Sequence, residues 1–118
     1  MDREFLIGAA EPDGKPDLAE LVRDLTEVLG FELAELPDQE MFHGGDDTGH
    51  AWLKPGWRDP DEPYPSHPYQ LDIAYPSGPE LPYLNGLFDR LHALGRYRLI
   101  MLINGDCVRS THFPCDEW

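Results

Sequence analysis

The segment 43–50, which reads HGGDDTGH, is the stretch of the chain that most resembles a chemical site. It places two imidazoles seven residues apart with two carboxylates between them, and its glycines would allow the chain to fold back on itself. Zinc accepts such nitrogen and oxygen ligands, and a catalytic zinc needs only three from the protein. One hypothesis is therefore a metal-binding protein or metal-dependent enzyme that uses His43, Asp46, Asp47 and His50. The alternative is a solvated turn between two strands, for which Gly, Asp and Thr are standard residues.

Other signatures of catalysis are missing from the sequence. It contains no phosphate-binding Gly-Lys loop, no dinucleotide-binding glycine motif and no Gly-x-Ser-x-Gly nucleophile elbow. Acidic residues are so numerous that choosing two of them as general acid and general base would be arbitrary. We therefore predict no catalytic residue and no cofactor.

The two cysteines, Cys107 and Cys115, are expected to be free thiols. A strand over 107–113 would extend for about 20 Å, and the two remaining residues could retrace only about 7 Å of it. The two Cα atoms would then lie beyond the roughly 7 Å limit for a disulfide. Free thiols are typical of a reducing cytoplasm, and acidic surroundings would not stabilise a reactive thiolate.

Charge is the most unusual property of the chain. Its 23 acidic and 9 basic residues give a formal charge of -14, whereas a magnitude of about 2–8 suits a small soluble domain. The excess is concentrated in residues 1–62, which hold 17 acids and 5 bases. Such self-repulsion destabilises the compact state and calls for a functional reason. Nucleic acid and anionic membranes are disfavoured partners, because binding phosphate requires Lys and Arg clusters.

Acidic and aromatic residues are interleaved through the middle of the chain. Clustered carboxylates steer a basic partner, aromatic side chains supply buried area, and prolines reduce the entropy lost on binding. The alternative is a solvated acidic surface with its aromatic rings folded back on the core. The predicted partner-binding residues are Glu35, Asp38, Glu40, Asp46, Asp47, Trp57, Asp59, Asp61, Glu62 and Tyr64.

Two helices and six strands are predicted around these residues. The helix over 18–29 has Asp17 as its N-cap, Glu20 to complete a capping box and Gly30 at its end. A second helix carries an apolar stripe over 84–94. The predicted strands cover residues 4–9, 31–36, 51–54, 70–75, 98–103 and 107–113.

The connections complete the predicted fold. The polar segment 38–50 is expected to be a loop, as is the Pro-rich segment 55–69, whose five prolines exclude a helix or a central strand. Asn104-Gly105 is a hairpin turn signal. The order is β-α-β-β-β-α-β-β, and right-handed crossovers would place both helices on one face. We predict one α/β (α+β) domain over 1–118, a two-layer sandwich with a mixed sheet of about five to six strands.

Size, charge and predicted architecture are together similar to those of small, acidic, two-layer α/β immunity proteins. The resemblance implies an immunity protein or antitoxin that neutralises a basic bacterial toxin, for example a nuclease, by occluding its active site. Without a secretory signal or an apolar run of about 20 residues, we expect it in the cytoplasm. A mimic of nucleic acid, with carboxylates at phosphate spacing, is a further hypothesis, and the oligomeric state is open.

Overall fold

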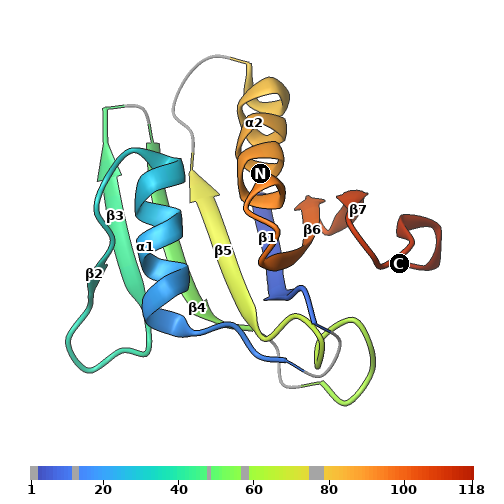
Figure 1. The fold of residues 1–118 in the computed structure, drawn as a ribbon. Helices are drawn as coiled ribbons and strands as arrows, with labels where there is room; N and C mark the ends of the chain where they lie inside the picture. Colours follow the sequence, from blue (N-terminus) through green and yellow to red (C-terminus); the bar gives the residue numbers. More distant parts are fainter. Residues whose placement is uncertain (1–2, 12–13, 48, 57–58, 75–78) are drawn as a thin grey trace.

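The computed structural model describes residues 3–11, 14–47, 49–56, 59–74 and 79–118 (Figure 1). Its elements are, in chain order, β1 (Arg3–Ala9), α1 (Leu18–Leu29), β2 (Ala34–Glu35), β3 (Phe42–Asp46), β4 (Gly49–Pro55), β5 (Tyr69–Ala74), α2 (Glu80–Ala93), β6 (Tyr97–Ile103), β7 (Asp106–Ser110) and the 3-10 helix η1 (Cys115–Glu117). The α+β class with two α-helices is confirmed. Tyr75, the predicted end of the strand that became β5, lies outside the described residues.

The described strands form a single sheet of seven strands in the order β2-β3-β4-β5-β1-β6-β7. Every neighbouring pair is antiparallel. The predicted mixed sheet of five to six strands is therefore wrong in strand count and in strand direction. The crossover through α2 does join two strands that run parallel to each other, β5 and β6. However, β1 lies between them and pairs with both in the antiparallel sense.

The strand β3 lies inside the segment 38–50, which the sequence analysis expected to be a loop. Its two consecutive glycines are unusual in a strand interior. Because they have no side chains, they interrupt the alternation of apolar and polar residues by which a strand is predicted. A Cβ atom at Gly44 would lie 2.1 Å from the carbonyl oxygen of Glu32, so this glycine allows a close approach of two backbones. The strand expected over 31–36 is reduced to β2, at the edge of the sheet.

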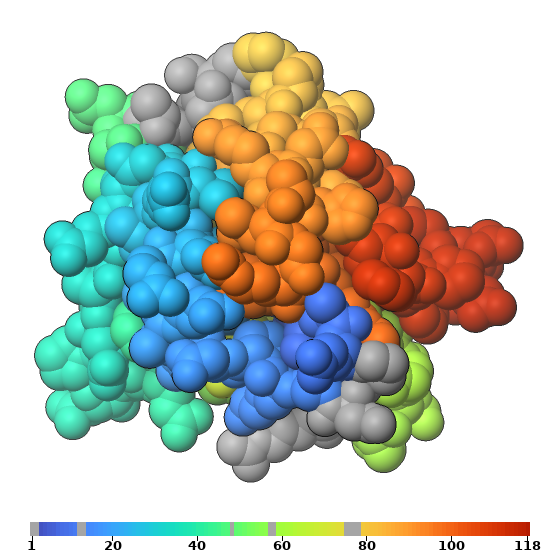
Figure 2. All heavy atoms as spheres, in the orientation of Figure 1, coloured from blue at the N-terminus to red at the C-terminus, as the bar shows by residue number. Residues whose placement is uncertain are grey.

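Both helices cover the same face of the sheet, as the crossovers predicted, and Figure 2 shows them side by side across this face. Apolar side chains of β1, β4, β5 and β6 pack beneath them and form the main core. Eight of its members, each at most 2% exposed, are Phe5, Ile7, Leu21, Leu25, Leu53, Leu71, Phe88 and Leu99. Within the described residues, neither helix has the length and apolar character that a membrane crossing requires.

Local signals placed the ends of α1 and the hairpin turn correctly. The Asp17 side chain accepts a hydrogen bond of 3.0 Å from the backbone N–H of Glu20. Gly30 follows α1 with a φ of 83°, the left-handed conformation that ends many helices. Asn104 and Gly105 have φ values of 53° and 83°, the positive values that a tight hairpin turn of this type requires.

The opposite face of the sheet carries a smaller, second core over β1 and β6. Leu6, Ile100 and Leu102 are buried there, and Tyr64 of the Pro-rich segment and Phe113 near the C-terminus pack against them. The Pro-rich segment lies directly on β1: a Cβ atom at Gly8 would lie only 1.8 Å from the carbonyl oxygen of Ser66.

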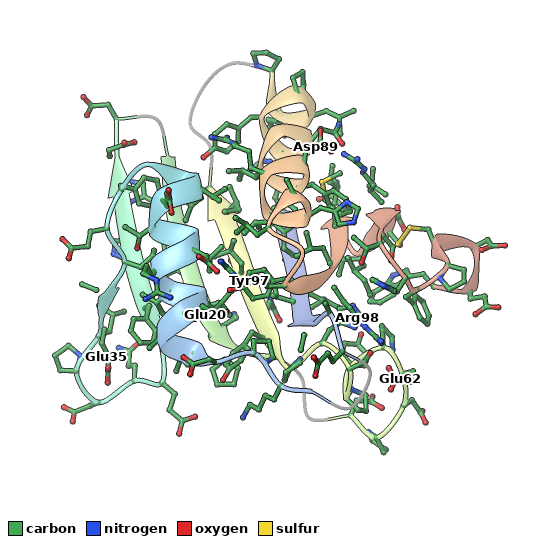
Figure 3. All side chains as sticks on the ribbon, viewed as in Figure 1. Glu20, Glu35, Glu62, Asp89, Tyr97 and Arg98 are labelled. Atoms are coloured by element: carbon green, nitrogen blue, oxygen red, sulfur yellow. A yellow bond between two sulfur atoms is a disulfide. The ribbon has the colours of Figure 1, made fainter. Side chains whose placement is uncertain are left out.

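Cys107 and Cys115 form a disulfide, with their Cα atoms 5.1 Å apart, so the prediction of two free thiols is wrong (Figure 3). The expected strand over 107–113 was too long. The strand β7 ends at Ser110, the chain bends over 111–113, and η1 brings Cys115 back beside β7. The bend removes the extended distance on which the prediction depended.

Candidate binding site

A pocket of about 780 Å³ lies at the end of the sheet where β3 begins and β4 ends. Its apolar lining comes from four elements or their margins, through Leu18, Phe42, Leu53 and Tyr69. Leu53 and Tyr69 are 1% and 9% exposed, so this part of the lining is continuous with the main core. The volume falls within the roughly 300–1,000 Å³ that ligand pockets usually have.

The Pro-rich segment supplies one wall of the pocket, which includes Tyr64. The backbone N–H of Gly56 donates to the Pro68 carbonyl at 2.8 Å, which closes the base of the segment. Further along, the N–H of Tyr64 donates to the Asp61 carbonyl at 3.1 Å, and the N–H of His67 to the Tyr64 carbonyl at 3.2 Å. These turns, together with the fixed φ of proline, hold the backbone of the wall in one conformation although it contains no helix or strand.

His67 anchors this wall to the sheet. Only 2% of the residue is exposed, and its Nδ1 lies 3.0 Å from the Pro63 carbonyl oxygen. Burial lowers the pKa of His67 below its usual value, so the ring is neutral at pH 7. Because a carbonyl can only accept, Nδ1 is the protonated nitrogen that donates to Pro63. The buried Nε2 then has no hydrogen-bond partner among the described residues.

Three carboxylates belong to the pocket lining, and we call Glu35, Glu40 and Asp59 the acidic rim. Asp59 Oδ1 accepts a hydrogen bond of 2.8 Å from the backbone N–H of Asp61, which orients that carboxylate. Glu35 and Glu40 are exposed and make no hydrogen bond or ion pair within the part of the chain that the structure describes. Their charges are available to a cation from outside.

Two lysines also line the pocket, but each has a partner of its own. Lys15 Nζ lies 5.7 Å from the centre of the Tyr69 ring. Lys54 Nζ forms an ion pair of 2.9 Å with Asp72 Oδ2, on the sheet face that the helices leave uncovered. Among the described lining residues there are three carboxylates and two ammonium groups, one of which is neutralised by Asp72, so these side chains together carry an excess of negative charge.

The structure brings four of the ten predicted partner-binding residues into the pocket lining: Glu35, Glu40, Asp59 and Tyr64. Asp38 lies in the turn between β2 and β3, where its φ is 62°. Asp61 and Glu62 belong to the Pro-rich segment outside the lining, and Glu62 accepts a hydrogen bond of 2.5 Å from Ser66 Oγ. Figure 3 shows Glu62 on the opposite side of the molecule from Glu35.

Asp46 and Asp47 do not join this group. Asp46 and Asp47 lie at the other end of β3, in and beside the turn to β4. A strand rises by about 3.3 Å per residue, so the length of β3 separates them from the pocket. Trp57 lies outside the described residues.

The pleat of β3 separates the members of the proposed metal site. Phe42 packs against the main core, and Asp46 follows it by an even number of residues on the same strand, so it projects to the helix side. His43 projects to the uncovered face, where its ring stacks on that of His50 with centroids 5.5 Å apart and planes 6° apart. Among the described residues, no group of three or more His, Cys, Asp or Glu side chains could hold a metal ion.

Sequence reasoning missed the apolar half of the pocket. Phe42 falls within the segment 38–50 that was predicted to be a loop, and Leu53 within the strand predicted over 51–54. The usable signal was the alternation in β4, where Gly49, Ala51 and Leu53 are buried and the residues between them are not. That pattern indicates a strand with one buried face, but only the pairing in the structure places Phe42 on the strand beside it.

No protein-family model matches the chain, and comparison with curated proteins and with solved structures gives no significant match.

Proposed function

We propose that this protein is a small acidic inhibitor, of the immunity-protein or antitoxin kind, that binds a basic protein partner. The partner would be a bacterial toxin, for example a nuclease, whose active site is occluded in the complex. The observation that carries the proposal is an apolar pocket bordered by the oriented carboxylate of Asp59 and by Glu35 and Glu40, two exposed carboxylates without a hydrogen bond or ion pair to any described residue.

Arginine and lysine side chains from a partner fit both halves of this site. Their methylene groups can pack on apolar surface while the charged end reaches the rim, as Leu53 and Tyr69 next to Glu40 would allow. Arginine has the additional ability to stack on aromatic rings and to donate two hydrogen bonds to one carboxylate. A cavity of about 780 Å³ is larger than a single side chain, so we propose that it receives the tip of a basic loop.

The net charge supports fast recognition of such a partner. With a formal charge of -14, the protein attracts a basic protein over a long range, and steered association reaches about 10⁸–10⁹ M⁻¹s⁻¹ at low salt. The pocket then confers specificity, because apolar contact requires shape as well as charge. A tight complex that weakens with salt is the expected behaviour.

A charge-matched pair of variants tests the site. One variant neutralises the acidic rim with Glu35→Gln, Glu40→Gln and Asp59→Asn. The control variant makes the same change in net charge with Glu27→Gln, Glu32→Gln and Asp47→Asn, three exposed residues outside the pocket. An oligoarginine peptide serves as the cationic probe, and oligocitrulline of the same length is its neutral counterpart.

The rim variant should bind oligoarginine about tenfold more weakly than wild type, a loss of about 1.4 kcal/mol, and its affinity should depend less on salt. The control variant should stay close to wild type. Equal losses in both variants would mean that net charge, and not the pocket, binds the probe. Affinity capture from native lysate, with wild type and both variants in parallel, would then test for a natural partner. A basic protein should be recovered with wild type and with the control variant, and less of it with the rim variant.

The expected cytoplasmic location belongs to this proposal, and the disulfide offers a direct test of it. Disulfides are rare in reducing compartments and persist in oxidising ones. Alkylation of thiols at the moment of cell lysis, followed by mass measurement, would report the state of Cys107 and Cys115 in the cell. Two alkylated thiols fit the cytoplasm, whereas an intact disulfide places the protein in an oxidising compartment.

A further inference from the structure

The last residues of the chain fold back as a strap, residues 111–118, against the sheet face that the helices leave uncovered. The disulfide joins Cys115 in the strap to Cys107 in β7. Beyond it, the indole N–H of Trp118 donates to the Gly105 carbonyl at 2.6 Å. The ring of Phe113, also in the strap, packs on the second core.

The strap is in contact with the wall of the pocket. The ring centroids of Trp118 and Tyr64 lie 6.1 Å apart, and those of Trp118 and Phe113 lie 6.3 Å apart with the planes nearly perpendicular. Tyr64 also lines the pocket. One tyrosine therefore touches the strap on one side and the pocket on the other.

We propose that the Cys107–Cys115 pair is a redox switch that sets the order of the pocket wall over residues 59–68. In the disulfide form, the covalent link holds the ring of Trp118 against Tyr64 and the ring of Phe113 against Trp118. In the dithiol form, the contacts with described residues that hold the strap beyond Thr111 are ring packing and the Trp118 bond to Gly105, and Tyr64 then packs against a ring that the disulfide no longer holds in place. The effect on partner binding rests on the proposed function, whereas the effect on the wall does not.

The chemical step is an ordinary exchange with a dithiol reductant. One thiolate of the reductant attacks a sulfur of the pair, and the released cysteine thiolate takes up a proton. The second thiolate of the reductant then attacks the mixed disulfide, which frees the other cysteine and closes the reductant into its own disulfide. Two electrons pass from the reductant to the Cys107–Cys115 bond. Both cysteines are partly exposed, so a small reductant can reach them.

Few other contacts hold the strap in the dithiol form. Its backbone is tied to the sheet at its start, where the N–H of Thr111 donates to the Leu99 carbonyl at 2.9 Å. The bonds within η1, from Glu117 to Pro114 and from Trp118 to Cys115, are local and do not fix its position. Local openings of this kind cost little when few buried contacts oppose them.

Hydrogen exchange on the full-length protein, with and without dithiothreitol, tests the switch without any partner. The reporters are the amides of Tyr64 and His67, which donate within the wall, and the reference is the amide of Leu25 in α1. On reduction we expect Tyr64 and His67 to exchange at least tenfold faster and Leu25 to be unchanged. Equal rates in the two redox states, or an acceleration that includes Leu25 equally, would overturn the proposal.

Variants distinguish the role of the disulfide from that of the ring contact between Trp118 and Tyr64, through which the disulfide is proposed to act on the wall. The double change Cys107→Ser and Cys115→Ser should exchange as the reduced protein does and ignore dithiothreitol. Oxidised Trp118→Ala should also accelerate the Tyr64 amide, because it removes the ring contact with the disulfide intact. Val108→Ala, which truncates an exposed side chain beside Cys107, is the matched control and should have no effect. A Trp118→Ala protein with wild-type exchange would rule out the ring contact as the link.

Binding of the oligoarginine probe completes the test. The reduced protein should bind it at least threefold more weakly than the oxidised protein. If the wall loosens but the affinity is the same, the pair controls the order of the wall without regulating binding, and the regulatory part of the proposal fails. If neither form binds the probe, the proposed function fails, while hydrogen exchange still decides whether the switch exists.

Discussion

The hydroxyl group of Tyr97, the first residue of β6, donates a hydrogen bond of 2.5 Å to Oδ2 of Asp24 in the middle of α1. Asp24 is 4% exposed, and Arg96 donates to both of its oxygens at 3.0 and 2.9 Å. A buried carboxylate is costly unless it is paired and hydrogen-bonded. This group of three residues therefore fixes the position of α1 over the sheet, and with it the Leu18 end of the helix that lines the pocket.

Replacing Tyr97 by Phe should destabilise the fold by about 2 kcal/mol, because a hydrogen bond to a charged group contributes about 1.5–3 kcal/mol. Urea unfolding followed by circular dichroism measures the change. Tyr69→Phe is the matched control, since its hydroxyl makes no hydrogen bond within the described residues. Equal stabilities of the two variants would show that the Asp24 bond contributes nothing.

Alkaline pH should weaken the fold through the same tyrosine. Burial, assisted by the hydrogen bond to Asp24, raises the pKa of Tyr97 above its usual value near 10. The unfolded chain then loses this proton at a lower pH than the folded protein does. The free energy of unfolding should therefore decrease as pH rises above about 10. Tyr97→Phe should show a smaller decrease than wild type, and an identical slope would contradict the assignment.

Acidic pH should weaken the fold through His67. Burial lowers the pKa of His67, although the Pro63 carbonyl and the charge of Glu62 oppose this effect, and Arg98 and His112 add to it. The unfolded chain therefore takes up this proton first, near pH 6.5, and stability should be lost as pH falls below that value.

The variant His67→Asn tests this pH dependence, because its amide can still donate to the Pro63 carbonyl but does not titrate. Its free energy of unfolding should change less than that of wild type between about pH 6.5 and pH 5. His92→Asn, on the exposed side of α2, should retain the wild-type slope. A slope that survives in His67→Asn would assign the effect to another group.

Two glycines should respond very differently to substitution by alanine. At Gly8 the new Cβ would lie 1.8 Å from the Ser66 carbonyl oxygen, whereas at Gly45 it would lie 2.1 Å from Nδ1 of His50. The Ser66 backbone is part of the docked Pro-rich segment and cannot move alone, so Gly8→Ala should cost about 3 kcal/mol or more. The exposed His50 ring can rotate away, so Gly45→Ala should cost well under half as much. Thermal unfolding of both variants checks this order, which equal costs would contradict.

Several parts of the fold could be predicted because their causes are local. The Asp17 cap and the Gly30 end delimit α1 by backbone hydrogen bonds within a few residues. The turn at Asn104-Gly105 depends on two positive φ values that these residues adopt readily. The acidic residues of the rim were also predicted as binding residues, since charge is a property of composition.

Other parts depended on neighbours that are distant along the chain. Gly44 is a glycine because the Glu32 carbonyl lies against it, and no local rule distinguishes that case from a turn. For this reason β3 was predicted as a loop, and the metal-site hypothesis treated His43 and Asp46 as able to converge. In a strand, their odd separation places them on opposite faces.

The sequence by itself determined the charge, the α+β class, the caps of α1 and the set of acidic residues from which the rim is drawn, because these follow from residue type and short-range spacing. Only the tertiary structure decided the strand order, the insertion of β1 between β5 and β6, the Cys107–Cys115 disulfide and the apolar lining of the pocket. Alternation specifies which side chains of a strand are buried. Which strands become neighbours is set by the packing of the whole chain, since many pairings satisfy the same alternation.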